Sequence, residues 1–327
     1  MNLKDKLSIK AEPVEKALAK YLKIKEPKKL YEAMAHIPLS GGKRLRPVMA
    51  LLACELVGGV VKKAVPFATA IETIHNFTLV HDDVMDDDKL RHGVASAHVV
   101  FGTSIAILAG DALFSYGFEM VTDSDCSQEL KAELVRDLAI TVREISEGQQ
   151  MDLDFENRKY VSPEEYLKMI RLKTSILFGA AAFGGSRIGG ASLEEADELR
   201  QMATNIGLGF QIWDDYLDAT VSSKVLGKDS GSDIRQGKRT LLVIEALNRA
   251  SKSDCKRLLT ILDTDDNKDA DIAEAVAIME QCGALNKCHD LATEYLQGAE
   301  KIIYKYSDSE ARQLFLELLE YMVSRGH

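Results

Sequence analysis

The chain has 327 residues, of which 46% are apolar, and a formal net charge of −10 at pH 7. Such a chain can bury a large core, and its acidic balance argues against a nucleic-acid partner, which requires a basic surface. Five scattered cysteines fit a reducing compartment better than a disulfide framework. The N-terminus lacks a signal-peptide core, and the apolar stretches 99–110 and 175–185 are shorter than the ~20 residues that span a bilayer. We therefore expect a soluble, cytoplasmic protein without a transmembrane segment.

Apolar residues recur at helical spacing from the N-terminus onward. Residues 1–36 interleave charges with apolar side chains, which predicts one or two amphipathic helices. A break follows in HIPLSGGKRLRP, and Pro47 is well placed as the first residue of the next helix. Because Arg46 precedes this proline, we expect Lys43 and Arg46 at the approach to the helix N-terminus. Two cations beside free backbone N–H groups suit a diphosphate, although a basic loop is the simpler alternative.

Residues 75–93 alternate apolar residues with acids, and no glycine or proline interrupts them before Gly93, so we predict a helix. On a helix, Asp82 and Asp86 lie one turn apart, about 40° from each other around the axis. Carboxylates so close repel one another unless a cation lies between them, and hard oxygen ligands with open positions suit Mg²⁺. A solvated acidic face is the alternative.

The same spacing recurs at Asp214, Asp215 and Asp218 in QIWDDYLD. Two copies on apolar helical backgrounds predict two helices that face each other across a cavity with metal between them. Lys173 also lies in an apolar stretch, where a lysine needs an anionic partner. Convincing strand alternation is absent, so we predict an all-α fold with ten or more mostly antiparallel helices around a central hydrophobic cavity.

Several motifs together resemble the trans-isoprenyl diphosphate synthases, the family of archaeal-type farnesyl and geranylgeranyl diphosphate synthases. They are the two aspartate-rich motifs, GGKRLRP at 41–47, EGQQMDL at 147–153, the Lys173–Thr174 pair and GKDSGSDIRQGKRT at 227–240. The resemblance implies an isoprenoid synthase fold, a single polyprenyl synthetase domain over residues 1–327 and a homodimer. It also implies Mg²⁺, roughly three ions per active site. The implied reaction joins isopentenyl diphosphate to dimethylallyl, geranyl or farnesyl diphosphate.

The resemblance implies roles for individual residues. The implied metal ligands are Asp82, Asp86 and Asp214. Those implied for the allylic diphosphate are Arg91, Lys173, Thr174, Gln211, Lys228 and Lys238, of which Lys173, Thr174 and Gln211 are also implied in catalysis. Those implied for isopentenyl diphosphate are Lys43, Arg46, His75 and His92.

His92 departs from the family pattern, which has two arginines where this chain has Arg91 and His92. A histidine with a pKa near ~6.5 carries only part of a charge at pH 7, and it cannot donate two parallel hydrogen bonds to a phosphate as arginine does. We therefore expect weaker or pH-dependent binding of isopentenyl diphosphate, or compensation from Lys43 and Arg46.

Product length is implied by the residues before the first aspartate motif. In the family, bulk at the positions of Phe77 and Thr78 limits the growing chain, and two aromatic residues would stop it at fifteen carbons. Phe77 beside the smaller Thr78, without an insertion between Asp83 and Asp86, resembles geranylgeranyl diphosphate synthases with a twenty-carbon product. Fifteen carbons is the alternative. A non-catalytic regulatory subunit, and a terpene cyclase with a different second metal motif, are the other functions considered.

Overall fold

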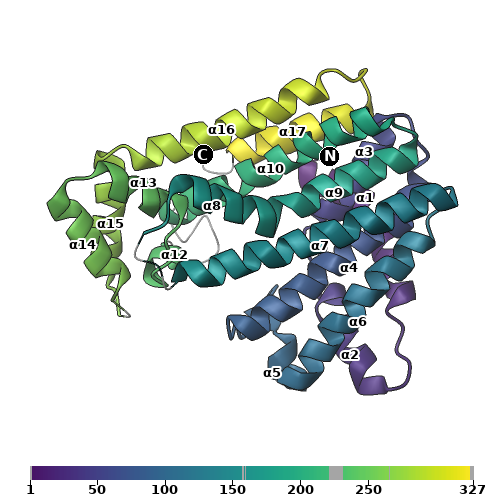
Figure 1. Cartoon of the computed structure of the whole chain (residues 1–327), viewed down its shortest axis with the longest axis horizontal. Coiled ribbons are helices and arrows are strands. Elements are labelled where there is room, and N and C mark those ends of the chain that lie inside the picture. The colour runs from purple at the N-terminus through teal and green to yellow at the C-terminus, as the bar shows by residue number, and fades with distance from the viewer. Residues whose placement is uncertain (1, 157, 159, 221–230, 265, 325–327) are drawn as a thin grey trace. The chain divides into compact units, whose positions relative to one another are not determined.

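The structure is a computed structural model that describes residues 2–156, 158, 160–220, 231–264 and 266–324 (Figure 1). The predicted all-α fold with ten or more helices is confirmed. Strand pairing in the described residues is a ladder of two residues per strand. The chain divides into two compact units, residues 1–142 with 177–203 and 304–315, and residues 143–176 with 204–303 and 316–327. A single domain over the whole chain stays a prediction.

The first unit contains the N-terminal helices, and residues 1–36, predicted to form one or two amphipathic helices, form two. Its elements are α1 (Leu3–Tyr21), α2 (Lys28–His36), the 3₁₀ turn η1 (Pro38–Ser40), α3 (Leu45–Leu56), α4 (Val61–Met85), β1 (Leu90–Arg91), β2 (Val94–Ala95), α5 (Ala97–Phe101), α6 (Thr103–Thr122), α9 (Ile176–Gly189) and parts of α7 (Gln128–Glu156), α10 (Leu193–Thr220) and α17 (Glu310–Ser324).

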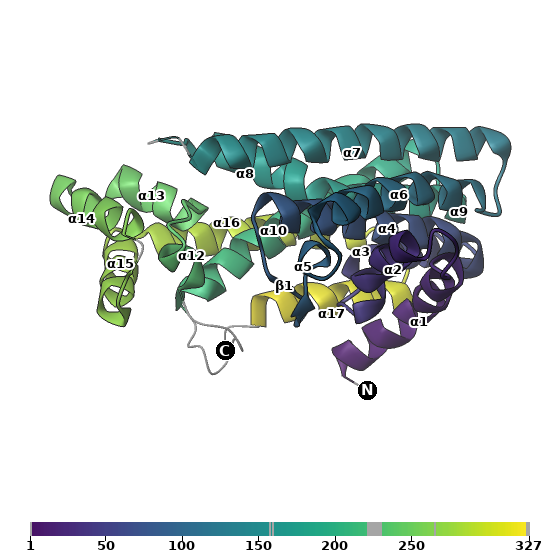
Figure 2. The same cartoon turned by 90° about the horizontal axis from the view of Figure 1, so that it is seen from below.

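Helix α4 is the centre of this unit and runs beside α6, as both Figure 1 and Figure 2 show. Its side chains Phe67, Ile71 and Ile74 are almost completely buried. Gly117 lets α6 approach closely, because a Cβ there would lie 2.6 Å from Cδ1 of Ile74. This packing fixes the helix that ends in the first aspartate motif.

Helix α6 is the one described helix that is long and apolar enough to cross a membrane, judged by length and composition alone. The sequence had suggested only the shorter apolar stretch 99–110. In the structure the helix packs against α4, α2 and α5, and 39% of its apolar window is buried. The core helix of a soluble protein passes the same test.

The second unit contains the other parts of α7, α10 and α17. Its remaining elements are α8 (Pro163–Ile170), the π-helical turn η2 (Arg171–Ser175), α12 (Ser232–Arg235), α13 (Leu241–Arg249), α14 (Lys252–Leu262), α15 (Asp269–Gln281) and α16 (Ala284–Ile303). Helices α14 and α15 lie side by side in both cartoon views. The core of this unit includes Ile212 and Leu217 of α10, beside the second aspartate motif.

Two predicted helix boundaries are wrong. Helix α3 begins at Leu45, so Arg46 lies in its first turn and Pro47 is not its first residue. Helix α4 ends at Met85, although residues 75–93 had been predicted as one helix. Asp87 adopts φ +52° and leaves the right-handed helical region. The chain then turns back through the short hairpin of β1 and β2.

Candidate active site

The first aspartate motif lies at the C-terminal end of α4. The N–H of Asp86 donates to the carbonyl oxygen of Asp82 at 2.8 Å, so these residues lie one turn apart, as predicted. The negative end of the helix dipole makes this an unfavourable place for carboxylates without a cation. Asp83 points elsewhere, because the next residue on a helix is turned by about 100°. Its fully buried carboxylate accepts from Nε of Arg91 at 2.7 Å and from Nη2 of the same guanidinium.

A group of basic side chains gathers where the GGKRLRP segment meets α4. Nη1 of Arg46 donates to Nε2 of His75 at 3.1 Å, and its guanidinium lies 4.5 Å from the ring centroid of Phe178. Because arginine can only donate, Nε2 of His75 accepts and the imidazole is neutral. Burial, and next the charge of Arg46, holds the pKa of His75 well below its usual range. Burial lowers the pKa of Arg46 to about 10, and its Nε is buried without a partner. Arg46 and His75 are thus brought together, as the predicted diphosphate site requires.

Arg44 was missed by the sequence reasoning. It adopts φ +52°, and only 5% of it is exposed. Nη1 donates to Oε1 of Glu72 at 2.5 Å, and Nη2 donates to the carbonyl oxygen of Pro38 at 2.5 Å. This ion pair fastens the GGKRLRP segment to α4. The available signal was Glu72 itself, because a glutamate within an otherwise apolar helix needs a cationic partner.

His92 lies in the turn between β1 and β2. His92 and Gly93 have φ +51° and +80°, as the two-residue type I′ hairpin turn requires. Cε1 of His92 lies 3.6 Å from the point where a Cβ on Gly42 would stand, so the turn lies against the GGKRLRP segment. Partial burial lowers the pKa of His92, as do Arg91, Arg44 and Lys43, whereas Asp83 opposes them. His92 and Lys43 therefore belong to the same basic group as Arg46 and His75.

Phe77, one of the two residues predicted to set product length, packs toward α6. Its ring centroid lies 5.3 Å from that of Phe114, which in turn lies 5.1 Å from that of Phe118. Thr78 is half-buried and donates from Oγ1 to the carbonyl oxygen of His75 at 2.8 Å. The aromatic residues of α6 did not enter the sequence prediction, because nothing local to either helix shows that the two lie side by side.

The second aspartate motif occupies the end of α10. Asp215 is buried and accepts from the hydroxyl of Tyr166 at 3.0 Å and from Nε2 of Gln211 at 3.0 Å. Burial, and next the charge of Asp233, raises the pKa of Asp215 to about 8. Gln211, predicted to bind the allylic diphosphate, therefore already holds the middle aspartate of its own motif. Asp214 lies one position before it on α10.

Asp218 holds the segment that follows α10. Only 2% of it is exposed. Its Oδ1 accepts from the hydroxyl of Ser232 at 2.7 Å, and its Oδ2 accepts from the N–H of Asp233 at 3.0 Å. Nζ of Lys238 lies 3.5 Å from Oδ1 of Asp233. Asp218 thus connects the second motif with the segment that bears Lys238. Lys228, the other lysine predicted in this segment, lies outside the described residues.

Lys173 and Thr174 lie in η2, where the helix widens into a π turn. Nζ of Lys173 donates to Oδ2 of Asp152 at 2.6 Å. Asp152 belongs to EGQQMDL, so this motif lies beside the Lys173–Thr174 pair. Gln149 of the same motif is buried, and neither polar atom of its side-chain amide has a hydrogen-bond partner.

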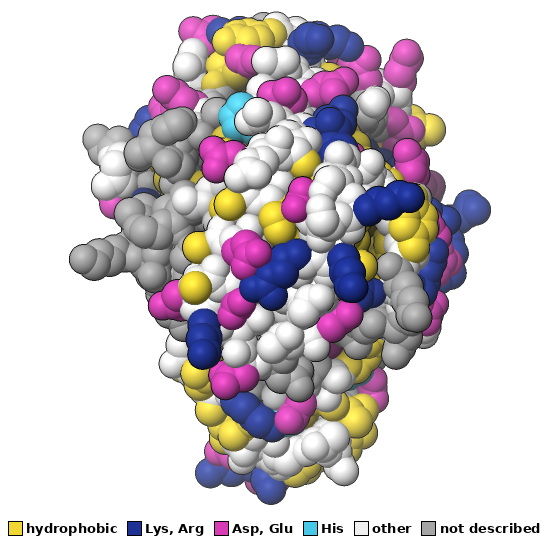
Figure 3. All heavy atoms as spheres, turned by 90° about the vertical axis from the view of Figure 1, so that its left-hand side faces the viewer, with side chains coloured by type: hydrophobic (Ala, Val, Ile, Leu, Met, Phe, Trp, Pro, Cys, Tyr) yellow, Lys and Arg dark blue, Asp and Glu magenta, His cyan; other side chains and the backbone are white. Residues whose placement is uncertain are grey.

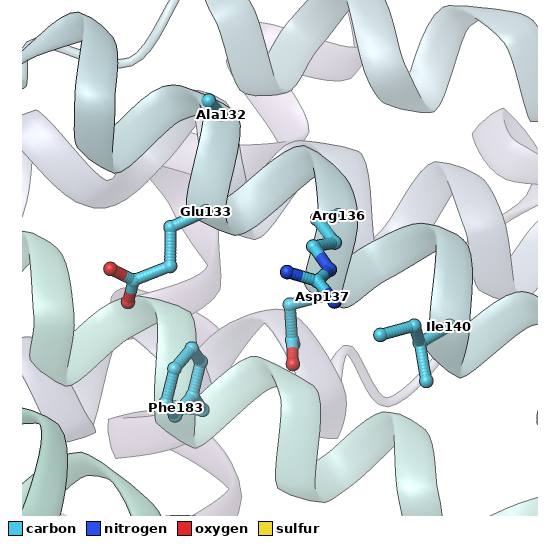
Figure 4. A pocket seen from close by; sticks show the side chains of 6 residues that line it. All are labelled: Ala132, Glu133, Arg136, Asp137, Ile140 and Phe183. Carbon is cyan, nitrogen blue, oxygen red and sulfur yellow. The ribbon is translucent and has the colours of Figure 1, made fainter.

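The contacts above do not test the predicted cavity between the two motifs, and a cavity that the structure does contain was not predicted. Asp82 and Asp86 belong to the first unit and Asp214 to the second, so a cavity shared by the two motifs stays a prediction. A hollow of about 390 Å³ lies between α7 and α9, and none of its lining residues was predicted as a site residue (Figure 4). Two of its acids are already paired, Glu133 with Arg187 and Asp137 with Arg200.

The model of the polyprenyl synthetase family matches residues 27–279. The chain belongs to the polyprenyl synthetase family. The geranylgeranyl diphosphate synthase of Methanosarcina mazei is 39% identical, over 100% of this chain and 99% of that protein. The short chain isoprenyl diphosphate synthase of Methanothermobacter thermautotrophicus is 42% identical over 92% of each. The crystal structure of geranylgeranyl pyrophosphate synthetase from Pyrococcus horikoshii superposes with a TM-score of 0.94, at 38% identity and 98% coverage of each chain.

These similarities extend well beyond residues 40–240, where the recognised motifs lie. The predictions of a prenyltransferase, of a short-chain isoprenyl diphosphate synthase and of the isoprenoid synthase fold are confirmed. The roles of individual site residues stay predictions. The geometry adds that the basic group gathers beside the first motif and that both middle aspartates are buried.

Proposed function

We propose that this chain joins isopentenyl diphosphate to allylic diphosphates and releases geranylgeranyl diphosphate, with twenty carbons. The observation that carries the proposal is the end-to-end similarity to relatives named geranylgeranyl diphosphate synthases, among them those of Methanosarcina mazei and Geoglobus acetivorans. Incubating the purified protein with dimethylallyl and isopentenyl diphosphates and Mg²⁺, followed by chromatography of the products, tests it. A product that ends at another length would refute the twenty-carbon assignment.

The reaction breaks the bond between C1 of the allylic substrate and its diphosphate, which leaves an allylic cation. The double bond of isopentenyl diphosphate attacks this cation to form the new carbon–carbon bond, and transfer of a proton to the released diphosphate restores a double bond. Arg91, Lys173 and Lys238 supply positive charge for the departing diphosphate, and Lys228 is proposed to join them. Lys43, Arg46, His75 and His92 hold the diphosphate of the attacking substrate. The partnerless Nε of Arg46, inside a basic group, supports an anion at this place.

The aspartates at the end of α4 fit a hard divalent cation. Asp82 and Asp86 offer oxygen donors one turn apart, at the helix end where the dipole favours positive charge. We assign Asp82, Asp86 and Asp214 as the residues that hold Mg²⁺, about three ions per site, together with oxygens of the substrate diphosphates. Bound there, Mg²⁺ would stabilise the negative charge that develops on the leaving diphosphate.

Product length distinguishes three candidates. The twenty-carbon assignment rests on Phe77 beside Thr78, and fifteen carbons is the shorter alternative. Relatives from Natronomonas pharaonis and Aeropyrum pernix, 37% and 38% identical, are named geranylfarnesyl diphosphate synthases, so twenty-five carbons is the longer one. The packing of Phe77 against Phe114 supports a bulky boundary at this point between α4 and α6. Thr78→Phe should shorten the main product, whereas an unchanged length would count against this assignment.

A non-catalytic regulatory subunit is the alternative from another functional class. Both aspartate motifs and the predicted lysines are present in the chain, which favours an active enzyme. Turnover by the purified protein without any partner decides between the two. Turnover that appears only after a second prenyl synthase chain is added would favour the regulatory role.

We further propose a homodimer that forms through α5 and α6. Val99 and Val100 of α5, with Ile107 and Leu108 of α6, are 42–56% exposed in the single chain. A second copy would cover this apolar surface, because exposed apolar residues that gather on neighbouring elements mark interaction sites. Light scattering should report a dimer for the wild type and a monomer for Leu108→Asp. Leu193→Asp, at a residue that is 58% exposed at the start of α10, is the matched control and should stay dimeric.

The protein is proposed to be soluble and cytoplasmic, without a nucleic-acid partner. On the face shown in Figure 3, the described acidic and basic side chains are intermixed. A nucleic-acid surface would instead present a field of positive charge. Fractionation of cells, with the protein followed by an antibody, tests the location.

A further inference from the structure

The turn that carries Lys173 and Thr174 has unusual backbone geometry. The backbone N–H of Ile176 donates to the carbonyl oxygen of Arg171. The side-chain hydroxyl of Ser175 donates to the carbonyl oxygen of Ile170 at 3.3 Å. The first of these is a backbone bond that reaches back five residues, which is the π-helical pattern and accommodates one residue more than an α-helical turn, whereas the second is a side-chain bond to a further carbonyl oxygen of the turn. Such a turn is rare and poorly stabilised by itself, so its surroundings must hold it in place.

Two glycines from other helices contact this turn directly. A Cβ on Gly148 of α7 would lie 2.4 Å from the backbone nitrogen of Lys173, and a Cβ on Gly207 of α10 would lie 2.8 Å from Cα of Ser175. The nearest atoms, the nitrogen of Lys173 and the Cα of Ser175, are backbone atoms of the turn, so no side-chain rotation can move them away. Glycine within a helix costs about 1 kcal/mol relative to alanine. The close approach of α7 and α10 to the turn is therefore what these two glycines provide.

Helix α7 also fixes the side chain of Lys173. Asp152 lies four residues after Gly148, on the same face of α7, and its carboxylate accepts from Nζ of Lys173 at 2.6 Å. Gly148 thus sets the position of the lysine backbone, and Asp152 sets the direction of its ammonium group.

We propose that Gly148 and Gly207 are positioning residues that seat the π turn, and that Asp152 aims Lys173 from the same platform. The inference rests on the proposed function, in which Lys173 binds the allylic diphosphate. A methyl group at residue 148 would have to move the turn by about 1 Å to reach an ordinary contact, since such contacts begin at 3.4 Å. A misplacement of about 1 Å can cost on the order of 10²-fold in rate.

A double-mutant cycle in kcat tests the proposal on the full-length enzyme, with geranyl and isopentenyl diphosphates as substrates. Gly148→Ala should lower kcat by about 10²-fold and leave the KM of isopentenyl diphosphate within about twofold. In the Lys173→Ala background the same substitution should change kcat by less than about threefold, because its effect runs through the lysine. Multiplicative losses in the double variant would overturn the proposal.

Two further variants keep the test decisive. Gly298→Ala is the control, because its Cβ would meet only the side-chain Nδ2 of Asn205, at 3.2 Å, and kcat should stay within about twofold. Should Gly148→Ala fail to fold, Gly207→Ala and Asp152→Asn each replace it in a double-mutant cycle with Lys173→Ala. The Asp152→Asn substitution alters no backbone contact. Independent losses in both of these cycles would overturn the proposal. A wild-type protein that forms no prenyl product would refute the proposed function, and with it this inference, whereas an active wild type with independent losses refutes the inference alone.

Discussion

Replacing His92 by arginine should lower the KM of isopentenyl diphosphate, and the gain should grow as the pH rises. His92 lies beside Gly42 in a type I′ turn, where its side chain is partly desolvated but still reached by solvent. Partial burial and the positive charge of Arg91 and Arg44 lower its pKa, so the imidazole is neutral at pH 7.5 and charges only below its ordinary value of ~6.5. A bound diphosphate favours the protonated form, so lowering the pH should bring the wild type toward the arginine variant.

The size of the effect follows from the exposure of the side chain. Two unit charges ~4 Å apart attract by about 1 kcal/mol in water and about 4 kcal/mol at an effective dielectric constant of ~20. Because solvent still reaches the side chain of His92, the lower figure applies, and it corresponds to about a fivefold change in KM. The arginine must also adopt φ +51°, a conformation in which histidine and asparagine are more common than other residues, so a small loss of thermal stability is expected.

The assay is steady-state kinetics with isopentenyl diphosphate as the varied substrate, from about pH 6 to 8.5. His92→Asn is the neutral control at the same backbone conformation. Both variants are compared with the wild type at each pH, since the substrate phosphate itself titrates near ~6. The wild type should resemble the asparagine variant at high pH and approach the arginine variant at low pH. A ratio of wild-type to arginine-variant KM that stays constant over this range would refute the reasoning.

Three further outcomes are expected. Glu72→Ala removes the buried carboxylate that pairs with Nη1 of Arg44 and leaves the exposed Glu15, 3.5 Å from its Nε, as its acidic partner, so the free energy of unfolding measured with denaturant should fall by about 3 kcal/mol. An unchanged midpoint would contradict the pairing. Asp218→Ala removes both acceptors that hold Ser232 and Asp233, so kcat should fall by about tenfold or more. Ser232→Ala should lower kcat less, because the bond from the N–H of Asp233 to Asp218 remains. Excess chelator should abolish product formation and added Mg²⁺ should restore it, and turnover that persists in chelator would exclude the metal assignment.

Sequence periodicity predicted the helical fold because helix formation is governed by spacing within one segment. The two wrong boundaries lie at residues whose conformation is set from outside their segment. Arg44 takes the left-handed conformation while its guanidinium pairs with Glu72, 28 residues away. Asp87 also takes the left-handed conformation, just after α4, although no glycine or proline in the sequence marks the end of that helix. Left-handed residues other than glycine leave little trace in a single sequence.

The features of the candidate site likewise fall into those that one segment determines and those that depend on contacts between helices. The one-turn spacing of Asp82 and Asp86 could be predicted, since it follows from helix geometry alone. The π turn around Lys173 could not, because it depends on glycines that reach it from α7 and α10. Nor could the contact between Phe77 and Phe114, which requires knowing that α4 and α6 are neighbours.

The two aspartate motifs have the same spacing, but their last aspartates lie in different surroundings. In each, the middle aspartate is turned into the protein, Asp83 against Arg91 and Asp215 against Tyr166. The last positions then differ. Asp86 is exposed at the end of α4, whereas the carboxylate of Asp218 accepts from Ser232 and from the N–H of Asp233.

The proposed function assigns the first and last aspartates of the first motif, and the first aspartate of the second, as the metal ligands. Such a small carboxylate set suits Mg²⁺, which prefers one or two protein carboxylates together with substrate phosphates over a complete protein cage. The repeated sequence pattern therefore supports two helix ends of unequal role. Under the proposed function the first would supply two metal-binding carboxylates and the second one, while the last aspartate of the second holds the segment that carries Lys238.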